Sequence, residues 1–286
     1  MPSPVSFGTR LRQAMDARGP LCVGIDPHPA LLEAWGLANS AEGVREFSLR
    51  VVEAMAGVAA IVKPQVALYE RFGSAGFAAL EETLQAAKAA DLLTLSDAKR
   101  GDIGSTMAAY ATAWLDDASP LASDAVTLSP YLGYESLRPA IDLAAATGRG
   151  VFVLGLTSNP EGASVQHVGG DKSVAKSIIE QVSKENAAAE DMGHVGLVVG
   201  ATIGDAPAKL GIDLSASKAP LLTPGLGAQG ATAQDIATAF ASSYRQVLGT
   251  SSRDILKAGP DALGLRDKAR RVRDELIAAK YQQLEK

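Results

Sequence analysis

The sequence predicts a closed (β/α)8 barrel, the TIM barrel architecture of the α/β class, with an additional helix at each end of the chain. Short runs rich in Val, Leu and Ile recur along the 286 residues, and helical stretches lie between them. Because these runs are apolar on both faces, they are typical of parallel strands that are covered on each side. Eight strands that alternate with helices over this length favour a barrel, and an open doubly wound sheet is the alternative.

The chain contains eight candidate strands and a set of intervening helices. We expect the strands at Leu21–Asp26, Ala60–Gln65, Leu92–Lys99, Ala125–Pro130, Gly150–Thr157, Val195–Thr202, Pro220–Gly225 and Gln246–Ser251. Helical patterns cover Phe77–Ala90, Ser105–Asp116, Ser173–Met192 and Ala231–Ser243, and flanking helices cover Phe7–Arg18 and Leu265–Leu284. No linker rich in Gly, Ser or Pro divides the chain, so residues 1–286 are expected to form a single domain.

Composition and charge argue against several classes of function. No apolar run is long enough to cross a membrane, and the N-terminus lacks the basic and apolar segments of a secretory signal. We therefore expect a cytoplasmic protein. The net charge is −5 and the basic residues are scattered, which argues against a nucleic-acid partner. The only cysteine, Cys22, lies in an apolar run and is predicted to be a buried hydrophobic side chain.

The most informative segment is 93–102, an apolar strand that ends in Asp97, Lys99 and Asp102. Side chains alternate along a strand, so Asp97 and Lys99 are expected on one face. A lysine between two carboxylates is costly to desolvate unless the charges offset one another. The segment therefore indicates either a site of proton chemistry or a structural ion pair in which Asp102 or Ser105 caps the next helix.

Polar residues also follow other predicted strands. Asp26 ends the first strand, Lys63 lies near the end of the second, and Ser158 follows the fifth. In a barrel the carboxyl ends of all strands meet at one mouth, where active sites of this architecture lie. The convergence of Asp26 and Lys63 with Asp97 and Lys99 at this mouth predicts an active site.

The last two strands predict a phosphate site. A glycine-rich turn over residues 224–230 follows the seventh strand, and Arg253 follows the eighth. Barrels commonly bind phosphate at these two loops. Backbone N–H groups in such a turn can approach an anion closely, and the planar guanidinium of Arg253 can bind two phosphate oxygens. A flexible loop and a surface arginine are the alternative interpretation.

The pattern Asp97-x-Lys99-x-x-Asp102, with Lys63 on the neighbouring strand, is the most specific motif of the chain. On these residues the sequence resembles the orotidine 5′-monophosphate decarboxylase family, and the resemblance extends from residue 21 to about residue 259. The segments 62–73 and 158–160 look like those of the longer bacterial, type 2 branch of this family.

The resemblance implies a reaction in pyrimidine synthesis that uses no metal and no organic cofactor. Orotidine monophosphate loses the carboxylate at C6 and becomes uridine monophosphate. Loss of carbon dioxide leaves a carbanion in the plane of the ring, so the protein must stabilise charge by fixed electrostatics. The resemblance implies an alternating charged chain of Lys63, Asp97, Lys99 and Asp102, in which Lys99 stabilises the carbanion and protonates C6.

The resemblance also implies contacts to the rest of the substrate. Asp26 and Lys63 are expected to hold the ribose hydroxyls. Ser158, or less favourably Thr157, is expected to bond the pyrimidine amide edge. The phosphate is expected to be held by Gln229 and Arg253.

A homodimer is a further implication of the resemblance. Thr106 lies four residues after Asp102, so both residues share a face of the predicted helix. In the family this pair reaches across a two-fold interface to the ribose in the neighbouring subunit's site. An ordinary helix start with a solvated Thr106 is the alternative.

Three other functions remain open on the sequence alone. A keto-sugar phosphate decarboxylase of the same superfamily would need a divalent metal. A Schiff-base aldolase would use Lys63 or Lys99, although the carboxylates beside Lys99 favour the charged ammonium over the nucleophilic amine. A non-catalytic nucleotide-phosphate binding protein would use the same scaffold, and the intact Asp97, Lys99 and Asp102 set argues against it.

Some segments receive no role from the sequence. The glycine-containing stretch Pro160–Ser173 is expected to form a long loop of unassigned function. His167 and His194 show no metal-ligand spacing and are expected at the surface. The run Gly249–Ser252 is more polar than the usual end of an eighth strand in the family.

Overall fold

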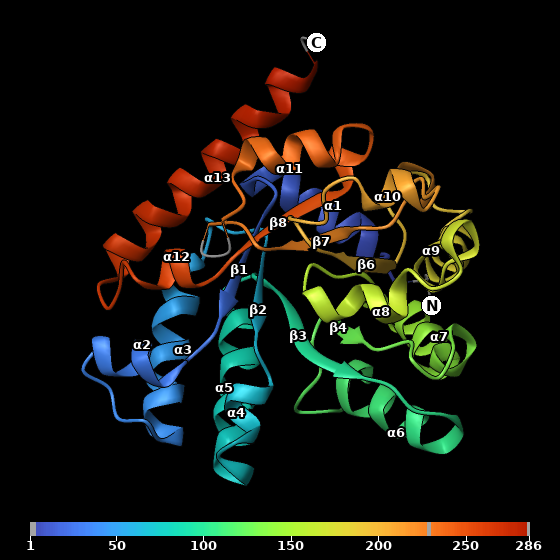
Figure 1. Ribbon diagram of the computed structural model, residues 1–286. Coiled ribbons are helices and arrows are strands. Elements are labelled where there is room, and N and C mark those ends of the chain that lie inside the picture. Colours follow the sequence, from blue (N-terminus) through green and yellow to red (C-terminus); the bar gives the residue numbers. More distant parts are fainter. Residues whose placement is uncertain (1–3, 228–229, 285–286) are drawn as a thin grey trace.

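The computed structural model describes residues 4–227 and 230–284, and within it eight parallel strands close into a barrel in sequence order (Figure 1). The strands are β1 (Leu21–Ile25), β2 (Ile61–Pro64), β3 (Leu93–Arg100), β4 (Ala125–Leu128), β5 (Gly150–Leu156), β6 (Val195–Val199), β7 (Leu221–Pro224) and β8 (Val247–Ser251). β8 pairs with β1 through Leu21 and Gly249, so the sheet has no open edge. The predicted barrel is confirmed, and the open doubly wound sheet is excluded.

Helices surround the barrel and cover its strands (Figure 1). They are α1 (Phe7–Arg18), α2 (Pro29–Ala34), α3 (Ala41–Met55), α4 (Ala67–Glu70), α5 (Gly73–Ala89), α6 (Gly104–Leu115), α7 (Arg138–Thr147), α8 (Ala163–Gln166), α9 (Val174–Glu185), α10 (Ala206–Lys209), α11 (Ala233–Ala239), α12 (Arg253–Leu256) and α13 (Ala262–Leu284). The helical patterns given above as expected do not include α3, α7 or the short helices α2, α4, α8, α10 and α12. α3 begins at the Ser40 cap, whose hydroxyl accepts a hydrogen bond from the backbone N–H of Gly43.

Two predicted helices end earlier than expected. The pattern over Ser173–Met192 becomes α9, which ends at Glu185 because the next residue, Asn186, turns its side chain inward. The buried Asn186 amide donates to the carbonyl oxygens of Val195 and Ser217 at 2.8 and 3.1 Å. The pattern over Ala231–Ser243 divides into α11 and a 3-10 turn, η5 (Ala241–Gln246).

The barrel interior is apolar, and α1 packs against it. Phe7 from α1 meets Phe152 from β5 edge-on, with the ring centroids 5.9 Å apart. A Cβ on Gly150 would lie 2.3 Å from the Phe7 ring, so this contact requires glycine at the start of β5. Cys22 is buried in the same cluster, and burial raises the pKa of its thiol to about 12. The prediction of a buried, unreactive thiol agrees with this environment.

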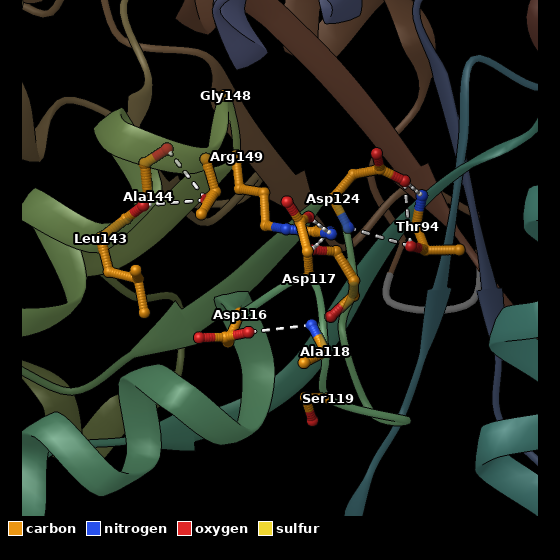
Figure 2. Close-up of polar contacts among 12 residues, drawn as sticks. Thr94, Asp116, Asp117, Ala118, Ser119, Asp124, Leu143, Ala144, Gly148 and Arg149 are labelled. Carbon is orange, nitrogen blue, oxygen red and sulfur yellow. Dashed lines mark hydrogen bonds and ion pairs between the residues drawn. The ribbon is translucent and has the colours of Figure 1, made fainter. Parts of the chain in front are cut away.

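Polar contacts hold the strand starts together, opposite the carboxyl ends (Figure 2). Asp124, just before β4, accepts hydrogen bonds from the backbone N–H and hydroxyl of Thr94 at 2.9 and 3.1 Å. Arg10 from α1 binds the other Asp124 oxygen at 2.5 Å. Arg149 binds Asp117 at 2.7 Å in the same region. Contacts at this end of a barrel serve stability, and the opposite end carries the chemistry.

The expectation that His194 lies at the surface is wrong. His194 lies just before β6 and is partly buried, with its Nε2 atom enclosed. Burial lowers the pKa of its imidazole below the usual value, because the charged form is poorly solvated there. His167 is also partly buried, in the loop after β5.

Candidate active site

A cavity of about 730 Å³ opens at the mouth formed by the carboxyl ends of the strands. Residues at or after the ends of every strand except β4 contribute to its wall. The structure brings together in this cavity six of the residues predicted from the sequence, namely Asp26, Lys63, Asp97, Lys99, Ser158 and Arg253. This volume is in the range of sites for small molecules, and its few charged groups converge from different strands.

A charged cluster of Lys63, Asp97 and Lys99 forms one side of the cavity. Lys63 Nζ lies 3.0 Å from Asp97 Oδ2, and Lys99 Nζ lies 2.5 Å from Asp97 Oδ1. The hydroxyl of Thr127 donates to Oδ1 at 2.9 Å. The side chains of Lys63 and Asp97 are only 7% and 9% exposed, whereas that of Lys99 is 46% exposed. Lys99 is therefore the member of the cluster that is available to a ligand.

Burial and neighbouring charges act in opposite directions on the pKa values of Asp97 and Lys63. Burial tends to raise the pKa of Asp97, but the ammonium groups of Lys63 and Lys99 outweigh it and hold the pKa well below the usual value. Burial tends to lower the pKa of Lys63, but the carboxylates of Asp97 and Asp26 outweigh it and leave the pKa raised. Asp97 and Lys63 are therefore both ionised at neutral pH.

The backbone of β3 changes course at the cluster. The pairing of β3 with β4 shifts register between Ser96 and Arg100. Within this irregular stretch Lys99 has a φ of 48°, which is uncommon for a residue other than glycine, and its N–H donates to the Thr127 hydroxyl at 2.9 Å. Irregularities of this kind re-aim side chains beside active sites. Thr127 thus holds both the Lys99 backbone and the Asp97 carboxylate.

Asp26, which follows β1, is held by a residue that follows β8, the strand that closes the barrel against β1. The Ser252 hydroxyl, which follows β8, donates to Asp26 Oδ2 at 2.5 Å. A Cβ on Gly24 would lie 2.7 Å from Ser252 Cβ, so glycine in β1 leaves room for Ser252. Sequence reasoning missed Ser252, and its only signal was the polar character of the end of β8. The cavity wall also includes His28, Gln65 and Gln166, which had no predicted role.

Asp102 and Thr106 lie outside the cavity wall of this chain. Asp102 accepts a hydrogen bond from the adjacent N–H of Ile103 at 2.8 Å, and Thr106 is exposed on α6. α6 begins after Ile103 with no side-chain cap, so the cap by Asp102 or Ser105, which belonged to the alternative interpretation of this segment, is not observed. A role for Asp102 and Thr106 in a neighbouring subunit's site stays a prediction.

The predicted phosphate site is described in part. Arg253 is exposed at the start of α12 and lines the cavity together with Gly225 and Leu226, which follow β7. Gln229 lies outside the described residues. The loops after β7 and β8 therefore reach the same cavity as the charged cluster, as expected for a barrel that binds a phosphorylated ligand.

The comparison with protein families decides the assignment. The family described as "Orotidine 5′-phosphate decarboxylase / HUMPS family" matches residues 19–266. The chain belongs to this family. An orotidine 5′-phosphate decarboxylase of Salinispora tropica is 55% identical over 276 residues, which cover 96% of this chain and 98% of the relative. The Streptomyces coelicolor orotidine 5′-phosphate decarboxylase is 54% identical over the same shares of both chains.

A solved structure supports the same placement. The crystal structure of a candidate orotidine 5′-phosphate decarboxylase from Streptomyces avermitilis superimposes with a TM-score of 0.93 at 53% identity. The match covers 98% of this chain and 97% of that one. The curated relatives are decarboxylases, that is, carboxy-lyases, and the eight-stranded barrel agrees with the predicted TIM barrel.

Two further observations concern the described residues. Across 4–227 and 230–284, no group of three or more His, Cys, Asp or Glu side chains is arranged to hold a metal ion. In the same ranges, no helix has the length and apolar character needed to span a membrane.

Proposed function

We propose that this protein decarboxylates orotidine 5′-monophosphate to uridine 5′-monophosphate without a cofactor, with Lys99 as the proton donor to C6. The observation that carries the proposal is the pairing of the half-exposed Lys99 ammonium with Asp97 inside the mouth cavity. The high identity to orotidine 5′-phosphate decarboxylases over nearly the whole chain supports the same substrate.

The chemistry follows from where charge develops. The bond between C6 and the carboxylate carbon breaks, carbon dioxide leaves, and the electron pair stays on C6. The Lys99 ammonium faces this carbanion and transfers a proton to it, which leaves uridine monophosphate and a neutral amine that regains a proton from water. A fixed cation at this point stabilises the transition state at no cost of reorganisation. Asp97 holds the Lys99 ammonium in position, and Lys63 with Thr127 keeps Asp97 in place.

The remaining contacts position the substrate. We assign the ribose hydroxyls to Asp26 and Lys63, the pyrimidine amide edge to Ser158, and the phosphate to Arg253 with Gln229. Asp26, Lys63, Ser158 and Arg253 line one cavity, so a single nucleotide can reach them all. Binding energy from the phosphate can then support catalysis at the distant C6 atom.

The proposal includes a homodimer with shared sites. Three apolar side chains are exposed in the loops after β3 and β4: Ile103 at 62%, Tyr131 at 81% and Leu132 at 55%. The two loops lie together, since the Ser129 N–H donates to the Arg100 carbonyl at 2.7 Å. Exposed apolar residues grouped beside Asp102 favour burial against a second copy of the chain. This surface would carry Asp102 and Thr106 to the neighbouring ribose.

The proposal extends to the whole chain and its location. We infer that residues 1–286 act as one functional unit in the cytoplasm. The single cysteine, a buried free thiol, is compatible with a reducing compartment. Cell fractionation with an antibody to the protein tests the location, and recovery in a membrane or secreted fraction would contradict it.

Spectroscopic turnover assays test the reaction itself. Loss of the orotidine monophosphate absorbance is followed with a metal chelator present, and the proposal predicts an undiminished rate. The family description also names HUMPS, so the metal-dependent keto-sugar phosphate decarboxylase is the competing function. Activity on a keto-sugar phosphate that disappears with the chelator, together with no turnover of orotidine monophosphate, would favour that competitor.

A further inference from the structure

The loop after β5 turns back onto the strand end through Gln166. The segment Pro160–Ser173 forms two short 3-10 turns, η2 (Pro160–Gly162) and η3 (Gly170–Lys172), with α8 between them. The side chain of Gln166, the last residue of α8, returns to Thr157 just beyond β5. Gln166 Oε1 accepts from the Thr157 N–H at 2.8 Å, and Gln166 Nε2 donates to Thr157 Oγ1 at 2.7 Å.

The same network holds both sequence neighbours of Ser158. The Thr157 hydroxyl donates to Asn159 Oδ1 at 2.6 Å, and Asn159 Nδ2 donates to Glu161 Oε2 at 3.0 Å. From below, a Cβ on Gly200 would lie 2.7 Å from Ser158 Cβ, so the end of β6 packs closely under Ser158. Ser158 is therefore held by its neighbours Thr157 and Asn159 and by the close packing of Gly200. Its own side chain is exposed in the wall of the cavity.

The direction of these hydrogen bonds makes Gln166 specific. The Thr157 hydroxyl has one proton and donates it to Asn159, so toward Gln166 it can only accept. The backbone N–H of Thr157 can only donate. The partner at position 166 must therefore offer one donor and one acceptor side by side, which an amide does and a carboxylate does not.

We propose that Gln166 is a positioning residue that sets the Ser158 hydroxyl for the amide edge of a pyrimidine and so determines base recognition. The inference rests on the proposed contact between Ser158 and the base. It assigns a role to the loop after β5, for which the sequence offered none.

Comparing the affinities of two ligands separates the contribution of the base from that of the ribose phosphate. Uridine monophosphate carries the pyrimidine, and ribose 5-phosphate does not. In calorimetric titrations, Gln166→Ala is expected to raise the Kd for uridine monophosphate about 3- to 10-fold, which corresponds to the loss of one neutral hydrogen bond. The Kd for ribose 5-phosphate should change by less than about 2-fold. Val165→Ala in the same short helix, at an exposed side chain, is the matched control and should change neither.

Two more variants separate the outcomes. Ser158→Ala should produce the same selective loss, and adding Gln166→Ala to it should produce no further loss, because both act on one contact. Thr157→Val removes the hydroxyl but keeps the N–H, and it should give a smaller selective loss even if Gln166→Ala folds poorly.

Equal weakening of both ligands by Gln166→Ala would overturn the inference, since the loop would then serve the whole cavity. A selective loss in Ser158→Ala without one in Gln166→Ala would overturn the positioning role and leave Ser158 as a base contact. No selective loss in Ser158→Ala would overturn the Ser158 assignment and the positioning role with it.

Discussion

Asp97 Oδ1 lies 2.5 Å from the Lys99 ammonium, while Lys63 occupies the other Asp97 oxygen from the buried side. One carboxylate thus serves two cations, and one of these cations is open to the cavity. Because the buried pair is complete without Lys99, the front ammonium can lose and regain a proton without leaving an isolated charge in the interior.

The first prediction concerns stability at acidic pH. Since the pKa of Asp97 lies below its unfolded value, its ionisation contributes stability that is fully present above about pH 4 and is lost as the pH falls through the lower folded value. Asp97→Asn removes the carboxylate that directly bonds the buried Lys63 ammonium. We expect this change to cost about 3 kcal/mol at pH 7 and to make the loss of stability at acidic pH smaller.

Urea unfolding between pH 3 and pH 7 measures this effect. Asp171→Asn, at an exposed carboxylate in η3, is the control and should keep the wild-type pH dependence. If Asp97→Asn keeps wild-type stability and the wild-type loss of stability at acidic pH, the buried pair of Lys63 and Asp97 does not stabilise the fold.

The second prediction concerns Ser252. Ser252→Ala removes the hydroxyl that holds Asp26 Oδ2, so the carboxylate loses its orientation toward the ribose. We expect KM for orotidine monophosphate to rise about 3- to 10-fold with a small change in kcat. The matched control is Ser251→Ala, because the buried Ser251 hydroxyl has no hydrogen-bond partner among the described residues. If both variants behave alike in steady-state kinetics, Ser252 does not position Asp26.

The third prediction concerns the phosphate. Arg253→Ala is expected to lower kcat/KM for orotidine monophosphate about 100-fold or more, since it removes charge-assisted bonds. The phosphate-free nucleoside orotidine should lose little. Lys257→Ala, an exposed cation at the end of α12, should affect neither substrate. Equal losses on nucleotide and nucleoside would remove Arg253 from the phosphate site.

The fourth prediction concerns the shared site. Lys99→Ala and Asp102→Ala are each expected to be nearly inactive, yet a heterodimer of the two contains one intact site if Asp102 acts across the interface. Equal mixing with free exchange should therefore restore about 25% of wild-type activity. Tyr131→Asp should weaken the dimer in sedimentation velocity and prevent this recovery. A mixture that stays inactive while dimers exchange would place Asp102 in its own subunit's site or in none.

The barrel and its charged cluster could be predicted because they depend on local patterns. Buried parallel strands are recognisable by their apolar runs, and charged residues at strand ends must meet at the mouth of a barrel. Contacts between distant segments were not predictable in this way. Ser252 and Asp26 are brought together by closure of β8 onto β1, and Gln166 reaches Thr157 through a loop with no periodic pattern. The positive φ of Lys99 also arises from a register shift that strand alternation does not reveal.

The most direct test is single-turnover decarboxylation by a folded Lys99→Ala protein, with binding of uridine monophosphate measured on the same sample. The account predicts no detectable carbon dioxide release, while the melting temperature stays near that of the wild type and the nucleotide still binds through Asp26, Ser158 and Arg253. Turnover close to the wild-type rate in this variant would contradict the assignment of Lys99 as the group that protonates C6.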